Sequence, residues 1–196
     1  FDGDWAAVRM PGLPDGRNTS ALGLTTLDLG KGDTPYLIAV NSGFIDDADL
    51  FEAGIALLDP ATTDLLREKF ISVGEVTLAH TLEPAFDETG RILYLVVEQP
   101  GARIISLNLE TGAREELGAL GGVLAGNVVD FVVEGGDAYL ADSAGKIIFF
   151  DLLGKSLKGA LSLPSVPYAL AVHEGYLYCA AGSRIIAVDP ATVPLE

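Results

Sequence analysis

The stretch Tyr139-Leu-Ala-Asp-Ser-Ala-Gly-Lys-Ile-Ile-Phe-Phe-Asp151 contains the unit from which the chain is built. It is an apolar strand that begins with tyrosine, a tight turn, and a second apolar strand that ends in Asp. Variants of it recur at Tyr36–Asp59, Tyr94–Asn108 and Tyr178–Asp189. The copies begin roughly 40 to 60 residues apart, which brackets the length typical of a four-stranded blade. One such unit cannot bury its apolar faces alone, so the copies must stack on one another.

A complete blade can be assembled around each copy of this unit. An apolar strand and a turn come before the tyrosine, as in Val129–Gly136 and Tyr168–Gly175, where an acidic residue comes shortly before glycine. Glycine accepts the positive φ that hairpin turns require, so these segments predict tight antiparallel connections. After the closing Asp or Asn, a further turn leads to a more polar fourth strand, as in Ser156–Leu161.

We therefore predict an all-β chain: a β-propeller of four-stranded antiparallel blades, with four repeats in one domain over residues 1–196. The expected blades cover residues 20–70, 78–118, 127–163 and 166–196. The leading tyrosines should occupy equivalent second strands and be buried between blades: Tyr36, Tyr94, Tyr139 and Tyr178.

The two ends of the chain predict how the ring closes. The last unit ends soon after Asp189 and lacks its outer strand, whereas residues 5–10 form an apolar strand without a unit of its own. Pairing these ends would close the ring and hide two strand edges. Two alternatives stay open: the chain is a fragment of a larger ring, or a second copy completes the ring.

Composition excludes several classes of function. The net charge is −16, and because phosphate groups bind through clustered Lys and Arg, we expect neither a nucleic-acid partner nor an anionic membrane surface. The most apolar glycine-rich run, residues 117–126, is too short to span a bilayer, so no membrane insertion is expected. Cys179 is the single cysteine and is expected to be buried, and the two histidines are expected to be ordinary loop residues.

The connection inside the first unit is longer than its counterparts, because it contains residues 44–54. Four carboxylates fall close together there, which suits a hard cation such as Ca²⁺, the candidate cofactor; a solvated acidic loop is the alternative. These carboxylates belong to Asp46, Asp47, Asp49 and Glu52. The segment also carries large apolar residues, which favour contact with a protein partner or a second copy of the chain. They are Phe44, Ile45, Leu50 and Phe51.

A second candidate site follows from propeller geometry, since the first strand of each blade lines the central channel. To within one residue of alignment, the channel mouth is expected at Glu83, Asp130 and Tyr168, with Ser20 or its neighbours in the first blade. Carboxylates that converge from different blades can hold one metal ion, which can then polarise a carbonyl or activate water. Acidic channel mouths also occur filled with water alone, and both interpretations stay open.

The segments 166–189 and 130–151 resemble NHL and YVTN-type β-propeller repeats, and Glu83–Gly112 is similar. The resemblance implies the propeller fold, and YVTN-type repeats imply a bacterial surface or periplasmic location. A related branch contains calcium- or zinc-dependent gluconolactonases, whose metal is held by the Glu of a Glu-Gly-Pro turn, an Asn and an Asp. Here Leu82-Glu83-Pro84 matches that turn without the glycine, and Asn127 and Asp130 lie outside a recognisable motif.

Two hypotheses follow. The first is a non-catalytic, exported propeller, extracellular or periplasmic after removal of a signal peptide, that acts as a protein-binding or assembly module through residues 44–54. The second is a metal-dependent (Ca²⁺ or Zn²⁺) lactonase-like hydrolase with its site at the central channel.

Overall fold

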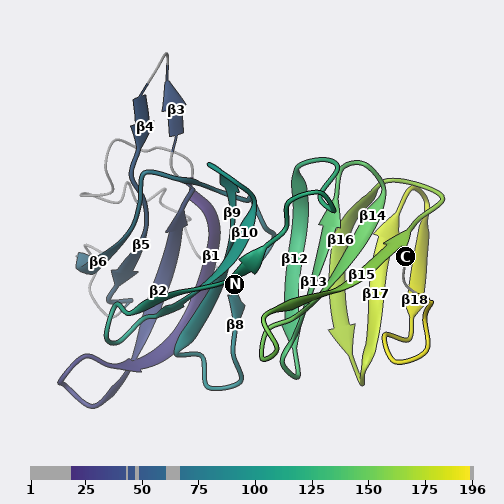
Figure 1. Ribbon diagram of the computed structural model, residues 1–196. Helices are drawn as coiled ribbons and strands as arrows, with labels where there is room; N and C mark the ends of the chain where they lie inside the picture. The colour runs from purple at the N-terminus through teal and green to yellow at the C-terminus, as the bar shows by residue number, and fades with distance from the viewer. Residues whose placement is uncertain (1–18, 43, 47–48, 61–66, 195–196) are drawn as a thin grey trace, which may run out of the picture.

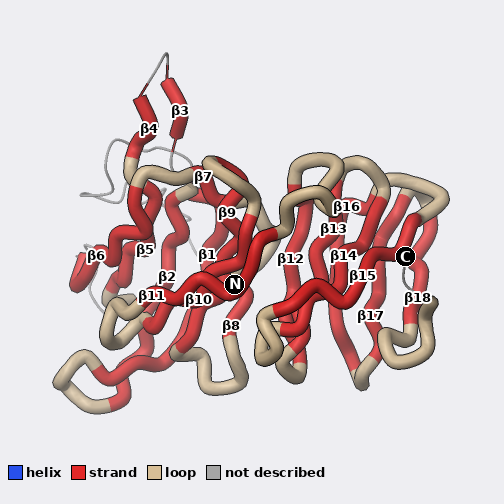
Figure 2. The backbone as a smooth tube through the Cα atoms, in the orientation of Figure 1, coloured by secondary structure: helices blue, strands red, loops and turns tan. Residues whose placement is uncertain are grey.

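A computed structural model describes residues 19–42, 44–46, 49–60 and 67–194 of the chain. Within these ranges the ordered secondary structure consists of β-strands (Figures 1 and 2). The same part of the chain has no helix that could cross a membrane.

Four antiparallel sheets follow one another along the chain, and each is one blade. Blade 1 consists of β1 (Thr19–Asp28), β2 (Asp33–Asn41), β5 (Ala53–Leu58) and β6 (Arg67–Gly74). Blade 2 consists of β7 (Thr77–Leu78), β8 (Ala85–Phe86), β9 (Ile92–Gln99), β10 (Arg103–Asn108) and β11 (Arg114–Ala119). Blade 3 consists of β12 (Val128–Glu134), β13 (Asp137–Asp142), β14 (Lys146–Asp151) and β15 (Ser156–Ser162). Blade 4 consists of β16 (Pro167–His173), β17 (Tyr176–Ala181) and β18 (Arg184–Val188).

The blades stand side by side in a row, from blade 1 at the left of Figure 1 to blade 4 at the right. The predicted four-stranded antiparallel blades are confirmed for blades 1 to 3, with β7 and β8, which both pair with β9, together taking the place of the first strand in blade 2. Blade 4 has three strands within the described residues, in line with the expected lack of an outer strand. The closing strand at residues 5–10 lies outside the described residues, so ring closure stays a prediction. Blades 1 and 4 lie at opposite ends of the row.

The leading tyrosines all occupy second strands, as predicted: Tyr36 on β2, Tyr94 on β9, Tyr139 on β13 and Tyr178 on β17. The first three pack into apolar clusters between their own blade and the next one. Tyr178 is only half-buried, because it lies on the face of blade 4 that no described blade covers. The prediction of burial between blades is wrong for this residue.

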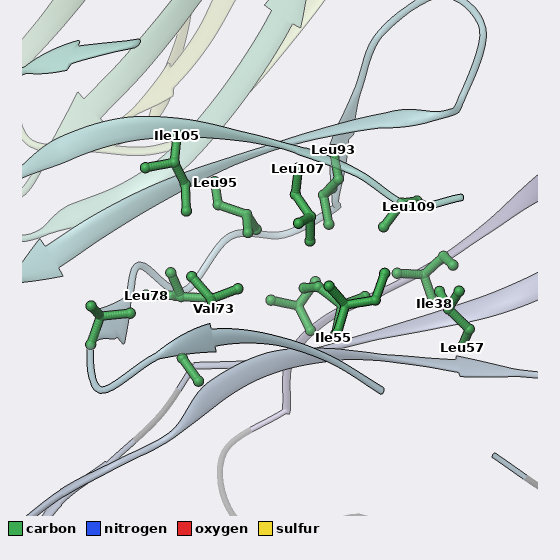
Figure 3. Packing of buried hydrophobic residues seen from close by; sticks show 14 of the residues in the cluster. Ile38, Ile55, Leu57, Val73, Leu78, Leu93, Leu95, Ile105, Leu107 and Leu109 are labelled. Carbon is green, nitrogen blue, oxygen red and sulfur yellow. The ribbon is translucent and has the colours of Figure 1, made fainter. Parts of the chain in front are cut away.

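Among the described residues, three layers of the core lie between neighbouring blades, and a fourth, smaller buried cluster of Ala39, Ala56 and Leu58 lies on the face of blade 1 turned away from blade 2. Figure 3 shows the first of them, where Ile38, Ile55 and Leu57 of blade 1 point toward Leu93 and Leu107 of blade 2. Alternation along each strand sends successive side chains to opposite faces, so the apolar blocks of one strand supply two layers at once. Complete burial of one such Leu or Ile contributes about 1.5–3 kcal/mol. The propeller is therefore held together mainly by contacts between blades.

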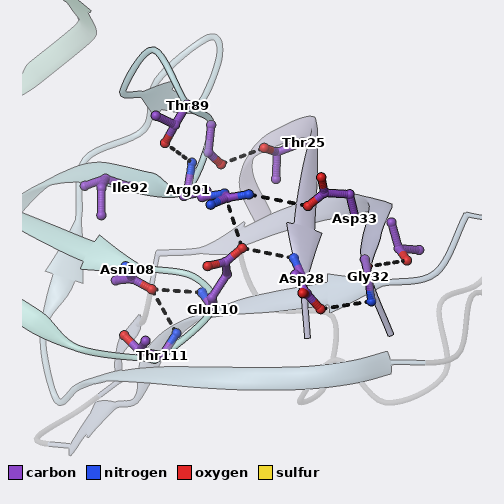
Figure 4. Close-up of polar contacts among 12 residues, drawn as sticks. Thr25, Asp28, Gly32, Asp33, Thr89, Arg91, Ile92, Asn108, Glu110 and Thr111 are labelled. Atoms are coloured by element: carbon purple, nitrogen blue, oxygen red, sulfur yellow. Dashed lines mark hydrogen bonds and ion pairs between the residues drawn. The ribbon is translucent and has the colours of Figure 1, made fainter. Parts of the chain in front are cut away.

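Polar contacts fix the orientation of blade 1 against blade 2 at the edge opposite the hairpin described below (Figure 4). The Arg91 guanidinium lies 3.3 Å from Glu110 Oε1 and 3.4 Å from Asp33 Oδ1. Glu110 Oε1 also accepts a hydrogen bond from the backbone N–H of Asp28 at 3.0 Å. The Thr25 hydroxyl donates to the Gly90 carbonyl at 2.6 Å. Because these pairs are largely exposed, each contributes about 1 kcal/mol or less, and their role is to set geometry.

Two local features depart from the regular blade. The first strand of blade 2 is not continuous: residues 79–84 interrupt it between β7 and β8, since Pro84 has no N–H for the sheet. Residues 44–54 do not form an irregular loop, because β3 (Phe44–Asp46) and β4 (Asp49–Phe51) pair as an antiparallel hairpin. This β3–β4 hairpin extends beyond the end of blade 1 in Figure 1.

Candidate functional site

The first strands of blades 2, 3 and 4 line a cleft of about 390 Å³. Residues 82–86, 130–134 and 170–172 form its wall, so it lies where a propeller has its central channel. The wall is mixed: Leu, Pro, Ala, Phe and Val side chains alternate with the carboxylates of Glu83, Asp130 and Glu134. The structure therefore brings two of the three predicted channel-mouth residues into one cleft.

Asp130 is 1% exposed, although it carries a carboxylate. Its Oδ2 accepts a hydrogen bond from the Leu170 N–H of blade 4 at 2.7 Å. Its Oδ1 accepts from the Phe131 N–H at 2.9 Å and from the Leu82 N–H of blade 2 at 3.3 Å. A buried charge must be paired or hydrogen-bonded, and backbone N–H groups from three blades satisfy this one. Asp130 is thus a clamp between neighbouring first strands.

Glu83 is exposed on the segment that interrupts the first strand of blade 2. The Thr81 hydroxyl donates to the Glu83 carbonyl at 3.0 Å, which shapes this segment locally. Pro84 lies against Gly23 of blade 1, where an added Cβ would come within 2.8 Å of the Pro84 ring. Glycine at position 23 therefore permits the close approach that places Glu83 at the cleft.

Tyr168 is exposed and lies at a register shift between Pro167 and Ala169. The same shift falls between Val128 and Asp130 in blade 3, so Tyr168 corresponds to Val129 and not to Asp130. Ser20 lies at the matching shift in blade 1. Tyr168 is absent from the wall of the cleft, and the three predicted mouth residues do not converge on one point.

The predicted channel-mouth and hairpin carboxylates do not form a metal site within the described residues. Among the described residues, no three His, Cys, Asp or Glu side chains lie close enough to hold an ion. Both oxygens of Asp130 already accept backbone N–H groups. In the β3–β4 hairpin the backbones of Asp46 and Asp49 pair, Asp47 lies outside the described residues, and Glu52 accepts a hydrogen bond from the Ser72 hydroxyl. We derive no metal-dependent step from this donor set.

A second cleft, of about 660 Å³, lies between blades 2 and 3 and was not predicted. It combines Phe86, Tyr94 and Leu153 with the acidic Asp87 and Glu134. Partial burial and then the negative charge of Asp87 raise the pKa of Tyr94, so its hydroxyl stays protonated and can donate a hydrogen bond at neutral pH. Much of the wall of this cleft comes from the turns after β8 and β12, and their acid–glycine pattern is visible in the sequence. That pattern predicts each turn but not that the two turns lie side by side.

Asp87 itself organises the turn at this cleft. Its Oδ1 accepts hydrogen bonds from the N–H groups of Ile92 at 2.9 Å and Arg91 at 3.0 Å, and its Oδ2 accepts from the Thr89 hydroxyl at 2.7 Å. Partial burial acts to raise the pKa of Asp87, but these hydrogen bonds together hold it below its ordinary value. The carboxylate is therefore ionised and structurally engaged at neutral pH.

No protein-family model matches this chain, and no curated protein matches it. Solved structures do match. The WD40 domain of coronin from Toxoplasma gondii superposes with a TM-score of 0.58 at 15% identity, over 91% of this chain and 50% of that structure. A gluconolactonase from Xanthomonas campestris superposes with a TM-score of 0.54 at 18% identity, over 87% of this chain and 57% of that structure. The chain adopts the β-propeller fold.

The computationally designed Ika4 protein matches with a TM-score of 0.56 at 14% identity, over 88% of this chain and 93% of Ika4. This propeller thus spans nearly all of one solved structure and about half of the two natural ones. At such low identity the likeness shows the fold alone. The predicted distant relation to β-propellers, including a gluconolactonase-like one, is confirmed at that level.

Proposed function

We propose that this propeller is a non-catalytic protein-binding or assembly module, extracellular or periplasmic, and that the β3–β4 hairpin is its main contact with a partner. The observation that carries the proposal is the hairpin itself. It projects from the end of blade 1 (Figure 1) and concentrates four large apolar residues among acidic ones. Hydrophobic burial would supply affinity, while the carboxylates would select a partner with a basic rim.

The base of the hairpin is paired on both sides, which suits a recognition element. Gly54 pairs with Asn41 on one side and with Ser72 on the other, so the hairpin leaves blade 1 from a three-strand junction. The Ser72 hydroxyl donates to the Glu52 carboxylate and so ties the end of the hairpin to β6. Binding residues are most effective when a rigid scaffold positions them, because little conformational entropy is then lost on binding.

The test is replacement of residues 44–52 with Asn-Gly. The replacement stops before Ala53 and Gly54, because Ala53 is buried and a Cβ at Gly54 would lie 2.2 Å from the Phe70 ring. The parent, this variant and a control variant at an exposed apolar residue outside both clefts, Val166→Ser, would be immobilised and exposed to the exported proteins of the source cells. We expect at least one protein that the parent and the control retain and the hairpin variant loses. A variant that folds and retains every partner of the parent would overturn the proposal.

The hydrolase hypothesis rests on one specific observation, the exposed Glu83 beside the channel cleft within the segment that resembles the lactonase turn. Thermal melts with Ca²⁺ and with Zn²⁺ test it. A tight site would raise stability by about 3–4 kcal/mol at saturating metal, and Glu83→Gln would abolish that gain. Melts that do not respond to either ion would exclude this alternative.

A further inference from the structure

The cleft of about 660 Å³ between blades 2 and 3 is built mainly from three turns. Blade 2 contributes the turn after β8 and part of β9, and blade 3 contributes the β12–β13 and β14–β15 turns. These turns lie at the end of the blades opposite the β3–β4 hairpin (Figure 1). Clefts of about 300–1,000 Å³ with apolar walls and a few polar groups are typical of small-molecule sites. This cleft is therefore a candidate ligand site separate from the hairpin.

The wall from blade 3 presents an exposed leucine on a tied turn. Leu153 is 84% exposed, more than any other large apolar side chain in the described part of the chain. The neighbouring Leu152 N–H donates to the Gly136 carbonyl at 2.9 Å, so the β14–β15 turn is bonded to the β12–β13 turn. Leu153 lies over Gly136, where an added Cβ would come within 3.1 Å of its Cδ1. The folded turns thus hold an apolar side chain at the cleft, where the apolar body of a ligand can cover it.

The wall from blade 2 presents two aromatic rings beside a carboxylate. Phe86 and Tyr94 are both partly buried and line the cleft. Aromatic rings attract organic cations that lie over their faces. Within the described residues the Tyr94 hydroxyl forms no hydrogen bond, so it is available to a ligand. The turn that carries Asp87 is held by the hydrogen bonds that this carboxylate accepts, so the wall is formed before any ligand binds.

The charge of the cleft is entirely negative. Asp87, Glu88 and Glu134 line it, and no Lys, Arg or His does. Within the described residues, Glu88 and Glu134 form no ion pair, and the basic residues close to the cleft in the sequence are engaged with other carboxylates. Those pairs are Arg91 with Asp33 and Glu110 (Figure 4), Lys155 with Glu115, and Lys158 with Asp137. The chain therefore leaves the negative charge of this cleft without a cation of its own.

We propose that this cleft binds a small organic cation, in which an amidinium, guanidinium or ammonium group is carried on an apolar body. The charged group lies beside the carboxylates of Glu88 and Glu134, and the body lies against the two rings and Leu153. A bare metal ion fits the cleft less well. Both oxygens of Asp87 already accept hydrogen bonds, and no group of acidic residues in the described part of the chain could hold an ion. A neutral apolar ligand would leave the carboxylates without a partner.

The test is titration of the folded chain with benzamidine, followed through the backbone amide signals in NMR spectra. Benzamidine carries an amidinium on a phenyl ring, and benzamide is its neutral isostere. We expect benzamidine to shift the amides of Gly135, Gly136 and Leu153 and to bind with a Kd of about 1 mM or below, which is within reach of so small a ligand. Benzamide should bind about tenfold more weakly, because it has no charge to place beside the carboxylates.

Variants of exposed residues assign the binding to the cleft without disturbing the fold. Glu88→Gln combined with Glu134→Gln should weaken benzamidine binding by about fivefold or more and leave benzamide binding unchanged. Leu153→Ser should weaken the binding of both ligands. The matched control combines Glu75→Gln with Glu174→Gln, which removes the same charge at two exposed residues outside the cleft. This control should bind benzamidine as the parent does.

Several results would overturn the proposal. They are the absence of benzamidine binding, equal binding of benzamidine and benzamide, and an affinity that the loss of Glu88 and Glu134 leaves unchanged. Binding of the peptide acetyl-Gly-Arg-Gly-amide without binding of benzamidine would also overturn it, because the cation would then need a polypeptide around it. None of these outcomes depends on the β3–β4 hairpin, so this proposal and the proposed function can fail separately.

Discussion

Replacing Asp130 with alanine should loosen the propeller at its channel. The substitution removes the acceptor of the Leu170 and Leu82 N–H groups, which come from the blades on either side. A hydrogen bond to a charged group contributes about 1.5–3 kcal/mol, and a buried donor left unpaired costs a comparable amount. The 2.7 Å bond from Leu170 belongs to the strong end of this range and the 3.3 Å bond from Leu82 to the weak end. We expect the free energy of unfolding to fall by about 3–5 kcal/mol.

Urea unfolding measures this loss, and hydrogen exchange locates it. The Leu170 amide should lose protection from exchange in Asp130→Ala. Asp130→Asn keeps one acceptor oxygen, so its protection at Leu170 and its free energy of unfolding should lie between those of Asp130→Ala and the parent. Asp142→Ala is the control, because Asp142 is equally buried but accepts the N–H groups of Ala125, Ala144 and Lys146, all in blade 3 or the loop that leads into it. Asp142→Ala should be less stable than the parent, and the protection of its Leu170 amide should be unchanged. An Asp130→Ala variant whose free energy of unfolding lies within about 0.5 kcal/mol of the parent's would refute the role of Asp130 as a clamp.

Burial, followed by the charges of Asp137 and Glu134, raises the pKa of Tyr139 from 10.0 to about 12. The contribution of the protonated Tyr139 hydroxyl to stability is therefore complete below pH 10.0 and is lost as the pH rises toward 12. An absorbance titration should show one tyrosine that ionises at higher pH than the others. Ionisation of all six tyrosines by pH 10.0 would contradict this. Burial and the charge of Asp130 raise the pKa of Cys179, so a thiol reagent should label it only on unfolding, and rapid labelling of the folded chain would speak against a buried thiol. Deletion of residues 1–10 should cost several kcal/mol if Trp5, Val8 and Met10 close the ring, at about 1.5–3 kcal/mol each; a truncated chain with the parent's melting temperature would exclude closure by this segment.

The blades could be predicted because their signals are local. Turn chemistry is an example: Glu174 and Gly175 both adopt positive φ, 51° and 77°, in the two-residue connection between β16 and β17. An acid–glycine pair between two apolar runs indicates such a turn without knowledge of the rest of the chain. Strand order within a blade then follows from short antiparallel connections, which leave few alternatives.

The hairpin in the insertion also carried a local signal that the prediction did not use. Phe44-Ile45-Asp46 is mirrored by Asp49-Leu50-Phe51, and the backbone pairs these residues in that mirrored order. Apolar residues flanking an acidic tip are typical of a short hairpin. The number of carboxylates favours a cation site, whereas the mirrored order of apolar and acidic residues predicts strand pairing, and the backbone shows the strand pairing.

The role of Asp130 could not be predicted, although its position could. Its partners Leu82 and Leu170 lie 48 and 40 residues away in the sequence, and no periodicity indicates which N–H groups will need an acceptor. Blade 2 leaves the Leu82 N–H outside its own sheet, because its first strand is interrupted before Pro84. The carboxylate of the next blade satisfies this group, so an apparent channel-mouth ligand is a structural residue.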